Sequence, residues 1–576
     1  MNNEQTKQLC LDLLRADTEA VVISLLEKDG HWNNDAVWRD YGDYENNYNT
    51  IGNQQSSPDA ALIEKIVNAI DARLMNECLV RGINPEGTAA PQTIRDAVAR
   101  FFDEDVDSMR AGRIREWSKE KRTAISRGIT VVATGVKGQE AGQPCFTIAD
   151  CGEGQTPANM PNTLLSLTKS NKLRIPFVQG KFNMGSTGVL NFCGRHNLQL
   201  IITRRNPAIL SNPLSDPSDM QWGFTIVRRE NPEGGRRSSV YTYLAPIGSD
   251  VQPSKGGVLR FSADRLSIFP EGNTPYIRES EWGTVVKLYE YASTGFRTNM
   301  LMRDGLLARA DILLPDVALP VRFHECRTYG GKPGSYETTL TGLGVRLGDD
   351  NDNLEFSSSS KLSVAGEEMS ATIFALKKNK AETYRKNEGI IFTLNGQTHG
   401  HLTRDFFARK AVGLTYIADS VLVIVDCSNF STRAREDLFK NSRDRLSHGE
   451  LRVEIERALE VLLKGHDGLK ALKEQRRREE LATRLEDEKP LKETLESLLK
   501  RSPTLSALFL QGGRISVPFK SATATTTTET AFEGKQYPTF FRFRGKEYGS
   551  KLNRECAINM LSRIAFETDA AHVYPS

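Results

Sequence analysis

A segment just after residue 60 has apolar residues at helical spacing. In ALIEKIVNAIDARLMNECL they recur three or four positions apart, namely at Leu62, Ile63, Ile66, Val67, Ile70 and Leu74. The preceding Ser-Ser-Pro-Asp at 56–59 is typical of a helix start, because proline is tolerated in the first helical turn. The pattern predicts a helix over residues 60–78 with one buried face and one polar face.

From residue 129 the pattern changes to the short apolar runs and alternation that are typical of strands. The segments are GITVVATGV, PCFTIAD, NLQLIITRR, WGFTIVRR, SVYTYLAPI and TVVKLYEY. A helix followed by antiparallel strands predicts the α+β class, here an α/β sandwich over residues 59–292. Residues 1–58 begin with an amphipathic helical pattern and continue as a polar, aromatic segment, which predicts an N-terminal arm lying on this sandwich.

A second set of elements follows over residues 293–450. It contains LLARADILLPDV, a strand meander through TLTGLGVRL and SATIFALKK, then EGIIFTLNGQ, a helix near LTRDFFARK and the buried strand VLVIVDC, which together predict a second α/β domain. Leucines at helical spacing predict a helical or coiled-coil segment over residues 451–502. The polar tract SATATTTTET then connects to a strand-rich remainder, so residues 503–576 are predicted to contain a small β-rich segment.

Composition indicates an ordinary multidomain globular protein. The chain has 576 residues, 39% hydrophobic and 26% charged, which is too long for one hydrophobic core. Its 76 basic and 73 acidic residues nearly balance, so net charge alone does not favour nucleic-acid binding. The eight cysteines stand singly and predict reduced thiols in a cytoplasmic protein. The N-terminus does not resemble a secretory signal, and the apolar runs are too short to span a bilayer, so we expect no membrane partner.

Three polar residues share one face of the predicted helix at 60–78. Glu64, Asn68 and Asp71 are separated by four and three residues, which aligns a carboxylate, an amide and a second carboxylate. Taken alone, such a stripe is more often the solvated face of an amphipathic helix. Two further motifs make a binding site the better interpretation.

Both further motifs are rich in glycine. At the end of the apolar run CFTI, Asp150, Gly152 and Gly154 form Asp-x-Gly-x-Gly, where the carboxylate suits an exocyclic amine and the glycines allow close approach of the backbone. VQGKFNMGSTGVLNFCG then offers backbone N–H groups of the kind that bind phosphate. The chain contains no Gly-x-x-x-x-Gly-Lys-Ser/Thr, so this is not a P-loop.

In their order along the chain, E-K-I-V-N-A-I-D-A, D-C-G-E-G and G-K-F-N-M-G-S resemble the three boxes of the GHKL ATPases. This superfamily includes gyrase, the ninety-kilodalton heat-shock chaperones, histidine kinases and MutL. W-G-T-V-V-K-L at 282–288 resembles a fourth box, the strand that closes the adenine site. The third box resembles the microrchidia form more than the chaperone form, because Asn183 stands where chaperones have glycine. The resemblance covers about residues 50–450 and implies a Bergerat-fold ATPase domain followed by a transducer-like domain.

The resemblance implies a role for each matching residue. Glu64 is expected to be the general base for the attacking water, Asn68 to bind Mg²⁺ and Asp71 to support the site. Asp150 is expected to bind the amine of adenine. The other residues expected to bind ATP are Gly152, Gly154, Gly180, Phe182, Gly185, Ser186, Thr187, Gly188 and Thr284.

Several basic residues are candidates for contacts with the phosphates. Lys169 and Lys172 lie in SLTKSNK, which resembles a mobile ATP lid, although solvated loop lysines would look the same. In related ATPases the transducer supplies a further cation, and here Lys440 is the first candidate, ahead of Arg443 and Arg445. A surface salt-bridge network is the alternative for these three residues.

The resemblance implies an ATP-driven conformational switch that needs ATP and Mg²⁺ and forms a homodimer. Two classes of activity remain open. One is a clamp on DNA of the MutL or microrchidia type, in genome maintenance or defence against phage, with the basic run at 476–478 as one contact. The other is a chaperone-like remodeller of a protein client.

Overall fold

The computed structural model describes residues 1–52, 54–55, 57–103, 111–137, 143–167, 172–180, 185–211, 214–232, 237–250, 255–292, 305–329, 332–333, 336–440, 445–483, 538–544, 547, 549, 551 and 565–569. The chain divides into two compact units, Met1–Thr483 and Arg484–Ser576. Within the described residues no helix is long and apolar enough to cross a membrane. The cysteines of this part of the chain are all free thiols.

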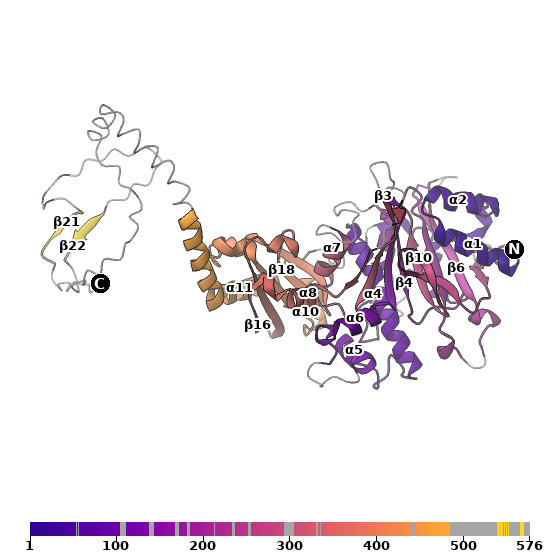
Figure 1. Ribbon diagram of the computed structural model, residues 1–576, viewed down its shortest axis with the longest axis horizontal. Helices are drawn as coiled ribbons and strands as arrows, with labels where there is room; N and C mark the ends of the chain where they lie inside the picture. The colour runs from indigo at the N-terminus through magenta and orange to yellow at the C-terminus, as the bar shows by residue number, and fades with distance from the viewer. Residues whose placement is uncertain are drawn as a thin grey trace, which may run out of the picture. The chain divides into compact units, whose positions relative to one another are not determined.

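A ten-stranded sheet, counted over the described residues, organises the N-terminal part of the first unit (Figure 1). Its order is β1-β7-β6-β5-β11-β4-β2-β12-β15, with β8 paired to β6. Only the β12–β2 pairing within it is parallel. The strands are β1 (Trp38–Asp40), β2 (Ile129–Thr134), β4 (Cys145–Asp150), β5 (Gln199–Arg204), β6 (Trp222–Glu230), β7 (Val240–Leu244), β8 (Leu259–Phe261), β11 (Gly283–Leu288), β12 (Val321–Glu325) and β15 (Tyr336–Leu340). The sheet therefore takes one strand from before residue 59 and two from beyond residue 292.

Alternate residues of the strands enter different cores on the two faces of this sheet. Phe146 and Ile148 of β4 pack with α4 (Pro58–Val80) on one face. Cys145 and Ala149 pack on the other face with a core that includes α1 (Asn3–Arg15) and α2 (Glu19–Lys28). Figure 1 shows α1 and α2 on the opposite side of the sheet from α4. Helices α5 (Ile94–Phe102) and α6 (Lys119–Ser126) extend the α4 side, and α3 (Tyr48–Gly52) precedes α4.

A five-stranded sheet of order β16-β17-β20-β18-β19 follows within the same unit. Its strands are β16 (Leu354–Val364), β17 (Glu367–Leu376), β18 (Glu388–Leu394), β19 (Gln397–Thr403) and β20 (Val421–Asp426). Its core continues into α9 (Asp405–Ala408), α10 (Thr432–Leu438) and α11 (Glu450–Gly465). Helix α7 (Leu306–Leu313) precedes it in sequence, and residues 467–483 form a further helix after a break at His466.

Smaller strand groups complete the description. β9 (Leu266–Glu271) pairs with β10 (Thr274–Ser280), and β3 (Val136–Lys137) pairs with β13 (Thr328–Tyr329), which pairs in turn with β14 (Lys332–Pro333). In the second unit, β21 (Phe541–Phe543) pairs with β22 (Phe566–Thr568). The predicted polar connector at 521–530 and residues 484–502 of the predicted helical segment lie outside the described residues.

The α+β class predicted from the sequence is confirmed, but one predicted strand is wrong. TLTGLGVRL begins in β15 and then becomes helix α8 (Leu343–Asp349). The strand ends because Gly342 has a φ of +83°, a conformation that side-chain-bearing residues rarely adopt. Leu343 and Leu347 are both buried, and their four-residue spacing is helical rather than extended.

Candidate nucleotide site

One face of α4 lines a cavity of about 500 Å³, a volume within the usual range for small-molecule sites. Lys65, Asn68, Ala69 and Ala72 all line it, and their spacing of three or four residues places them on one helix face. The loop after β4, the segment near Lys172 and strand β11 contribute further walls, through Asp150, Glu153, Gly154, Gln155, Thr156, Lys172, Ile175, Thr284 and Val286. Motifs that are far apart in the sequence therefore enclose one cavity.

Adjacent strands bring Asp150 together with two hydroxyl groups. Asp150 ends β4, and Thr284 of β11 is its direct cross-strand partner. The Thr284 hydroxyl lies 3.0 Å from the hydroxyl of Thr203 on β5. The Gln155 amide donates to the Thr203 hydroxyl over 3.0 Å. This corner of the cavity can therefore offer the Asp150 carboxylate and the Thr284 hydroxyl to the polar edge of a flat ring.

The Asp-x-Gly-x-Gly loop lies directly against α4. The Glu153 amide donates to the Ala72 carbonyl over 3.1 Å. A Cβ at Gly152 would lie 2.5 Å from the Cβ of Ala72, so only glycine fits there. Gly154 has a φ of +60°, and a side chain on it would overlap the carbonyl of Arg204. Both glycines are thus required for the loop to close one end of the cavity.

Asp150 is a carboxylate with an unusual proton affinity. Burial raises its pKa from 3.8 to about 7, while the Gly152 amide, which donates to Oδ1 over 2.8 Å, works in the opposite direction. A ligand amine donating to this carboxylate would stabilise its ionised form and lower the pKa. The electrostatics of Asp150 therefore suit an acceptor for one well-placed donor.

Asp71 holds the segment that leads into the glycine-rich motif. Its fully buried carboxylate accepts from the amides of Gln179 and Gly180, each over 2.9 Å, and lies 3.4 Å from Nζ of Lys172. Gly180 lies so close that a Cβ there would be 3.2 Å from Oδ1 of Asn68. Asp71 therefore acts on the chain that approaches the cavity rather than on the cavity wall.

Glu64 is contacted from the five-stranded sheet. Its carboxylate is 5% exposed and accepts from Nε2 of Gln397 over 2.7 Å. Gln397 is the first residue of β19. In the turn just before it, the carbonyl of Asn395 accepts from the side chain of Gln179. The β18–β19 turn thus contacts both the carboxylate on α4 and the segment that Asp71 holds.

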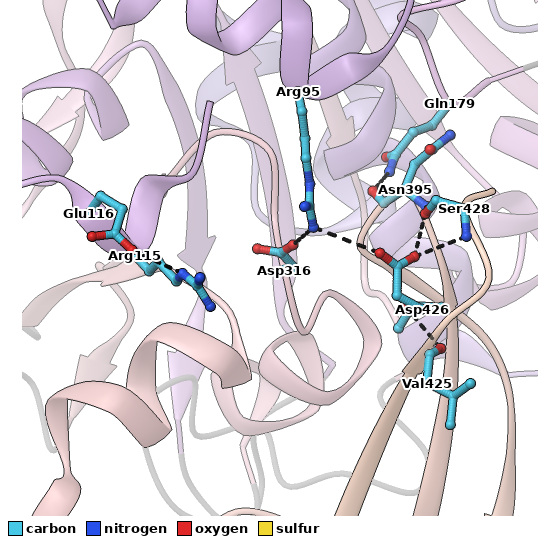
Figure 2. Close-up of polar contacts among 10 residues, drawn as sticks. Arg95, Arg115, Glu116, Gln179, Asp316, Asn395, Val425, Asp426 and Ser428 are labelled. Atoms are coloured by element: carbon cyan, nitrogen blue, oxygen red, sulfur yellow. Dashed lines mark hydrogen bonds and ion pairs between the residues drawn. The ribbon is translucent and has the colours of Figure 1, made fainter. Parts of the chain in front are cut away.

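Polar contacts continue from this turn toward α5, as Figure 2 shows. The Asn395 amide donates to the Ser428 hydroxyl over 2.8 Å, and the Ser428 amide donates to Asp426 at the end of β20 over 3.0 Å. Nη2 of Arg95 lies 3.8 Å from Asp426 and 2.6 Å from Asp316. Charged groups from α5, from the segment before β12 and from the end of β20 therefore meet around the turn.

The other predicted residues fall in different places. Gly185, Ser186, Thr187 and Gly188 begin the 3₁₀ helix Gly185–Phe192, Thr187 is buried, and Gly188 packs against Gln55. Lys169, Phe182 and Arg443 lie outside the described residues. Lys440 is exposed and is absent from the cavity wall, although the ring of the preceding Phe439 contacts His399 of β19.

The donors at the cavity fit a magnesium ion held mainly by a nucleotide. Asn68 offers one amide oxygen on the wall, a hard ligand of the kind Mg²⁺ accepts. No group of three or more His, Cys, Asp or Glu side chains positioned to hold a metal occurs in the part of the chain that the structure describes. Mg²⁺ commonly binds through one or two protein ligands together with phosphate oxygens and water, which this arrangement permits.

Two contacting residues were not identified from the sequence. Gln397 meets Glu64 across 333 positions, and only the glycine turn of L-N-G-Q hinted that its strand begins there. Thr203 lies in the apolar strand β5, which pairs with β11 in the sheet. The local sequence LIITR does not indicate this pairing, so it did not place Thr203 beside Thr284. Both positions depend on tertiary pairing rather than on local pattern.

Comparisons with known proteins do not show a family for this chain. No protein-family model matches the chain, and no curated protein matches it. A search of solved structures finds the B subunit of DNA gyrase from Myxococcus xanthus, at 14% sequence identity and a TM-score of 0.28. That match covers 60% of this chain and 85% of the gyrase chain. A likeness this low does not assign the chain to a family.

Proposed function

We propose that this chain binds ATP with Mg²⁺ in the cavity beside α4 and hydrolyses it to ADP and phosphate, as an ATPase of the GHKL type. The supporting observation is that residues from motifs resembling GHKL boxes, far apart in sequence, lie close together in space. Asn68, Asp150, Gly154 and Thr284 line one cavity, and Asp71 holds Gly180 beside Asn68.

In this proposal the adenine ring and the phosphates of ATP occupy opposite ends of the cavity. Asp150 accepts a hydrogen bond from the adenine amine, and Gly152 lets the loop after Asp150 pack directly against Ala72 of α4. The phosphates lie toward Asn68 and Gly180, where the amide oxygen of Asn68 is available. Bound Mg²⁺ would neutralise charge on the phosphates and orient them.

Glu64 serves as the general base in the proposed hydrolysis. Its carboxylate takes a proton from the attacking water, and the donation from Gln397 Nε2 fixes the orientation of the carboxylate. Because Gln397 belongs to the five-stranded sheet, a change in position of that sheet would directly change the orientation of the Glu64 carboxylate. This contact supports a switch in which the nucleotide state and the arrangement of the two sheets are coupled.

The test is steady-state ATP turnover together with ATP binding in wild type, Glu64→Ala and Asp150→Asn. Glu64→Ala should bind ATP normally and lose turnover by about 100-fold or more, because a general base contributes at least this much. Asp150→Asn should lose binding itself. Glu279→Ala, at an exposed position on β10, is the matched control and should behave as wild type. Equal turnover in wild type and Glu64→Ala would remove Glu64 as the base.

The finer proposal is a homodimer that closes on ATP as a clamp on DNA. The same turnover assay, repeated with duplex DNA and with an unfolded protein, separates this from remodelling of a protein client. Stimulation by DNA that weakens with salt supports the clamp, because phosphate contacts release counterions. Stimulation by the unfolded protein alone would replace the clamp with a client remodeller.

A further inference from the structure

Lys65 lies on the cavity wall and neighbours Glu64, the proposed general base. It follows Glu64 in the sequence, is 8% exposed, and shares a helix face with Asn68, Ala69 and Ala72. The GHKL resemblance assigned no role to this position. A nearly buried cation at a ligand cavity requires a physical explanation, because a buried charge is costly unless it is paired.

Among the residues that the structure describes, no carboxylate pairs with Lys65. Within the described part of the chain its ammonium has no hydrogen bond or ion pair, and the neighbouring thiol of Cys193 stays neutral because burial raises the pKa of that thiol. Burial lowers the pKa of Lys65 to about 8. The ammonium is therefore destabilised in the protein without a ligand.

A second buried lysine shows how this fold satisfies such a charge. Lys287 is fully buried, and its Nζ donates to the Leu14 carbonyl over 2.8 Å and lies 3.0 Å from Asp17. Despite burial, the surrounding groups raise the pKa of Lys287 above its ordinary value. Among the described residues Lys65 has no equivalent set of partners, and Lys65, unlike Lys287, lines the cavity.

The position of Lys65 along α4 indicates which part of a ligand it would meet. The Asp-x-Gly-x-Gly loop contacts α4 at Ala72, which marks the end where Asp150 lies. Lys65 is seven residues earlier, which corresponds to about 10 Å along a helix. This places Lys65 at the same end of α4 as Glu64, which Gln397 contacts, and away from the proposed adenine pocket.

We propose that Lys65 binds a phosphate oxygen of the nucleotide and gives the site its preference for nucleotides over nucleosides. This inference rests on the proposed function. Lysine is a compact, strongly charged donor that suits phosphate, and the cavity walls screen the interaction less than water would. The phosphate supplies the anionic partner that the described part of the chain does not offer to Lys65.

The test is calorimetric binding of adenosine, ADP and ATP to wild type, Lys65→Met and Lys65→Arg. Methionine keeps most of the side-chain volume without the charge. We expect Lys65→Met to lower the affinity for ADP and ATP by about tenfold or more and to leave adenosine binding unchanged. Lys65→Arg should keep most of the preference for ADP over adenosine. Lys470→Met, at an exposed position of the helix at 467–483, is the matched control.

The ratio of ADP to adenosine affinity separates the possible failures. Partial misfolding of Lys65→Met would weaken adenosine and ADP by the same factor, so misfolding alone does not change the ratio, and only loss of the phosphate contact lowers it. A wild type that prefers ADP, with the same ratio in Lys65→Met, would overturn the role of Lys65 and leave the proposed function standing. A wild type that binds none of the three ligands would overturn both.

Discussion

At the scale of single residues, Asp150 carries the clearest dependence on pH. Burial raises its pKa from 3.8 to about 7, so the carboxyl is largely protonated below that pH. The ionised form is the stronger acceptor for an amine. If only the ionised form of Asp150 binds adenine, adenosine affinity should rise roughly tenfold from one pH unit below the pKa of Asp150 to one unit above it. Adenosine is the ligand to measure, because it has no phosphate that titrates in the same range.

The stability of the free protein should change in the opposite direction. A carboxyl whose pKa is higher in the folded than in the unfolded state contributes stability that is complete below pH 3.8 and is lost as the pH rises through about 7. Thermal unfolding over the same pH range, without ligand, therefore serves as the control. Adenosine affinity that does not vary with pH would contradict the role of Asp150 as the acceptor.

At the scale of elements, the β18–β19 turn is the part of the five-stranded sheet that reaches the site. Gln397 donates to Glu64, and Asn395 accepts from Gln179 next to the residues held by Asp71. The turn itself depends on Gly396, whose φ is +81° and whose Cα lies close to the main chain of Asp316. One tight turn thereby places two polar groups against two parts of the candidate site.

Gln397→Ala should separate binding from catalysis. The substitution removes the donor that orients Glu64, so we expect ATP affinity within about twofold of wild type and a kcat reduced by up to about 100-fold. His401→Ala, four residues along β19 and exposed, is the control and should keep the wild-type kcat. A normal kcat in Gln397→Ala would show that Glu64 does not depend on this contact.

The helix and most strands could be predicted from the sequence because their patterns are local. α4 spans 58–80 where 60–78 was predicted, since the apolar spacing and Pro58 are both read within a few residues. α8 was missed because Gly342 interrupts a run that otherwise resembles β15 continued. The approach of Gln397 to Glu64 could not be predicted, because it depends on how one sheet packs against the other. The functional roles assigned to the site residues remain predictions.

At the scale of the first unit, a largely buried ionic group joins helix α4 to the five-stranded sheet. Arg309 of α7 lies 2.9 Å from Asp59, in the first turn of α4, and 2.7 Å from Glu388, at the start of β18. The side chains of the two carboxylates are 10% and 8% exposed. Burial alone would raise the pKa of Glu388, but the Arg309 guanidinium, together with the backbone amides that donate to the carboxylate, outweighs it and lowers that pKa to about 2. The same α4 that lines the cavity is thereby tied to β18, which leads into the turn at Asn395.

Arg309→Met should destabilise this unit far more than loss of a surface pair. It leaves two buried carboxylates without their cation, so we expect the free energy of unfolding to fall by about 3 kcal/mol, measured by chemical denaturation. Arg404→Met is the control, because its pair with Asp419 is exposed, and it should cost less than about 1 kcal/mol. Since the folded-state pKa of Glu388 is depressed, its contribution is full above pH 4.5 and is lost as the pH falls toward about 2. The difference in unfolding free energy between wild type and Arg309→Met should therefore narrow as the pH falls from 4.5 toward about 2. A difference that stays constant would mean that the guanidinium acts through packing rather than through charge.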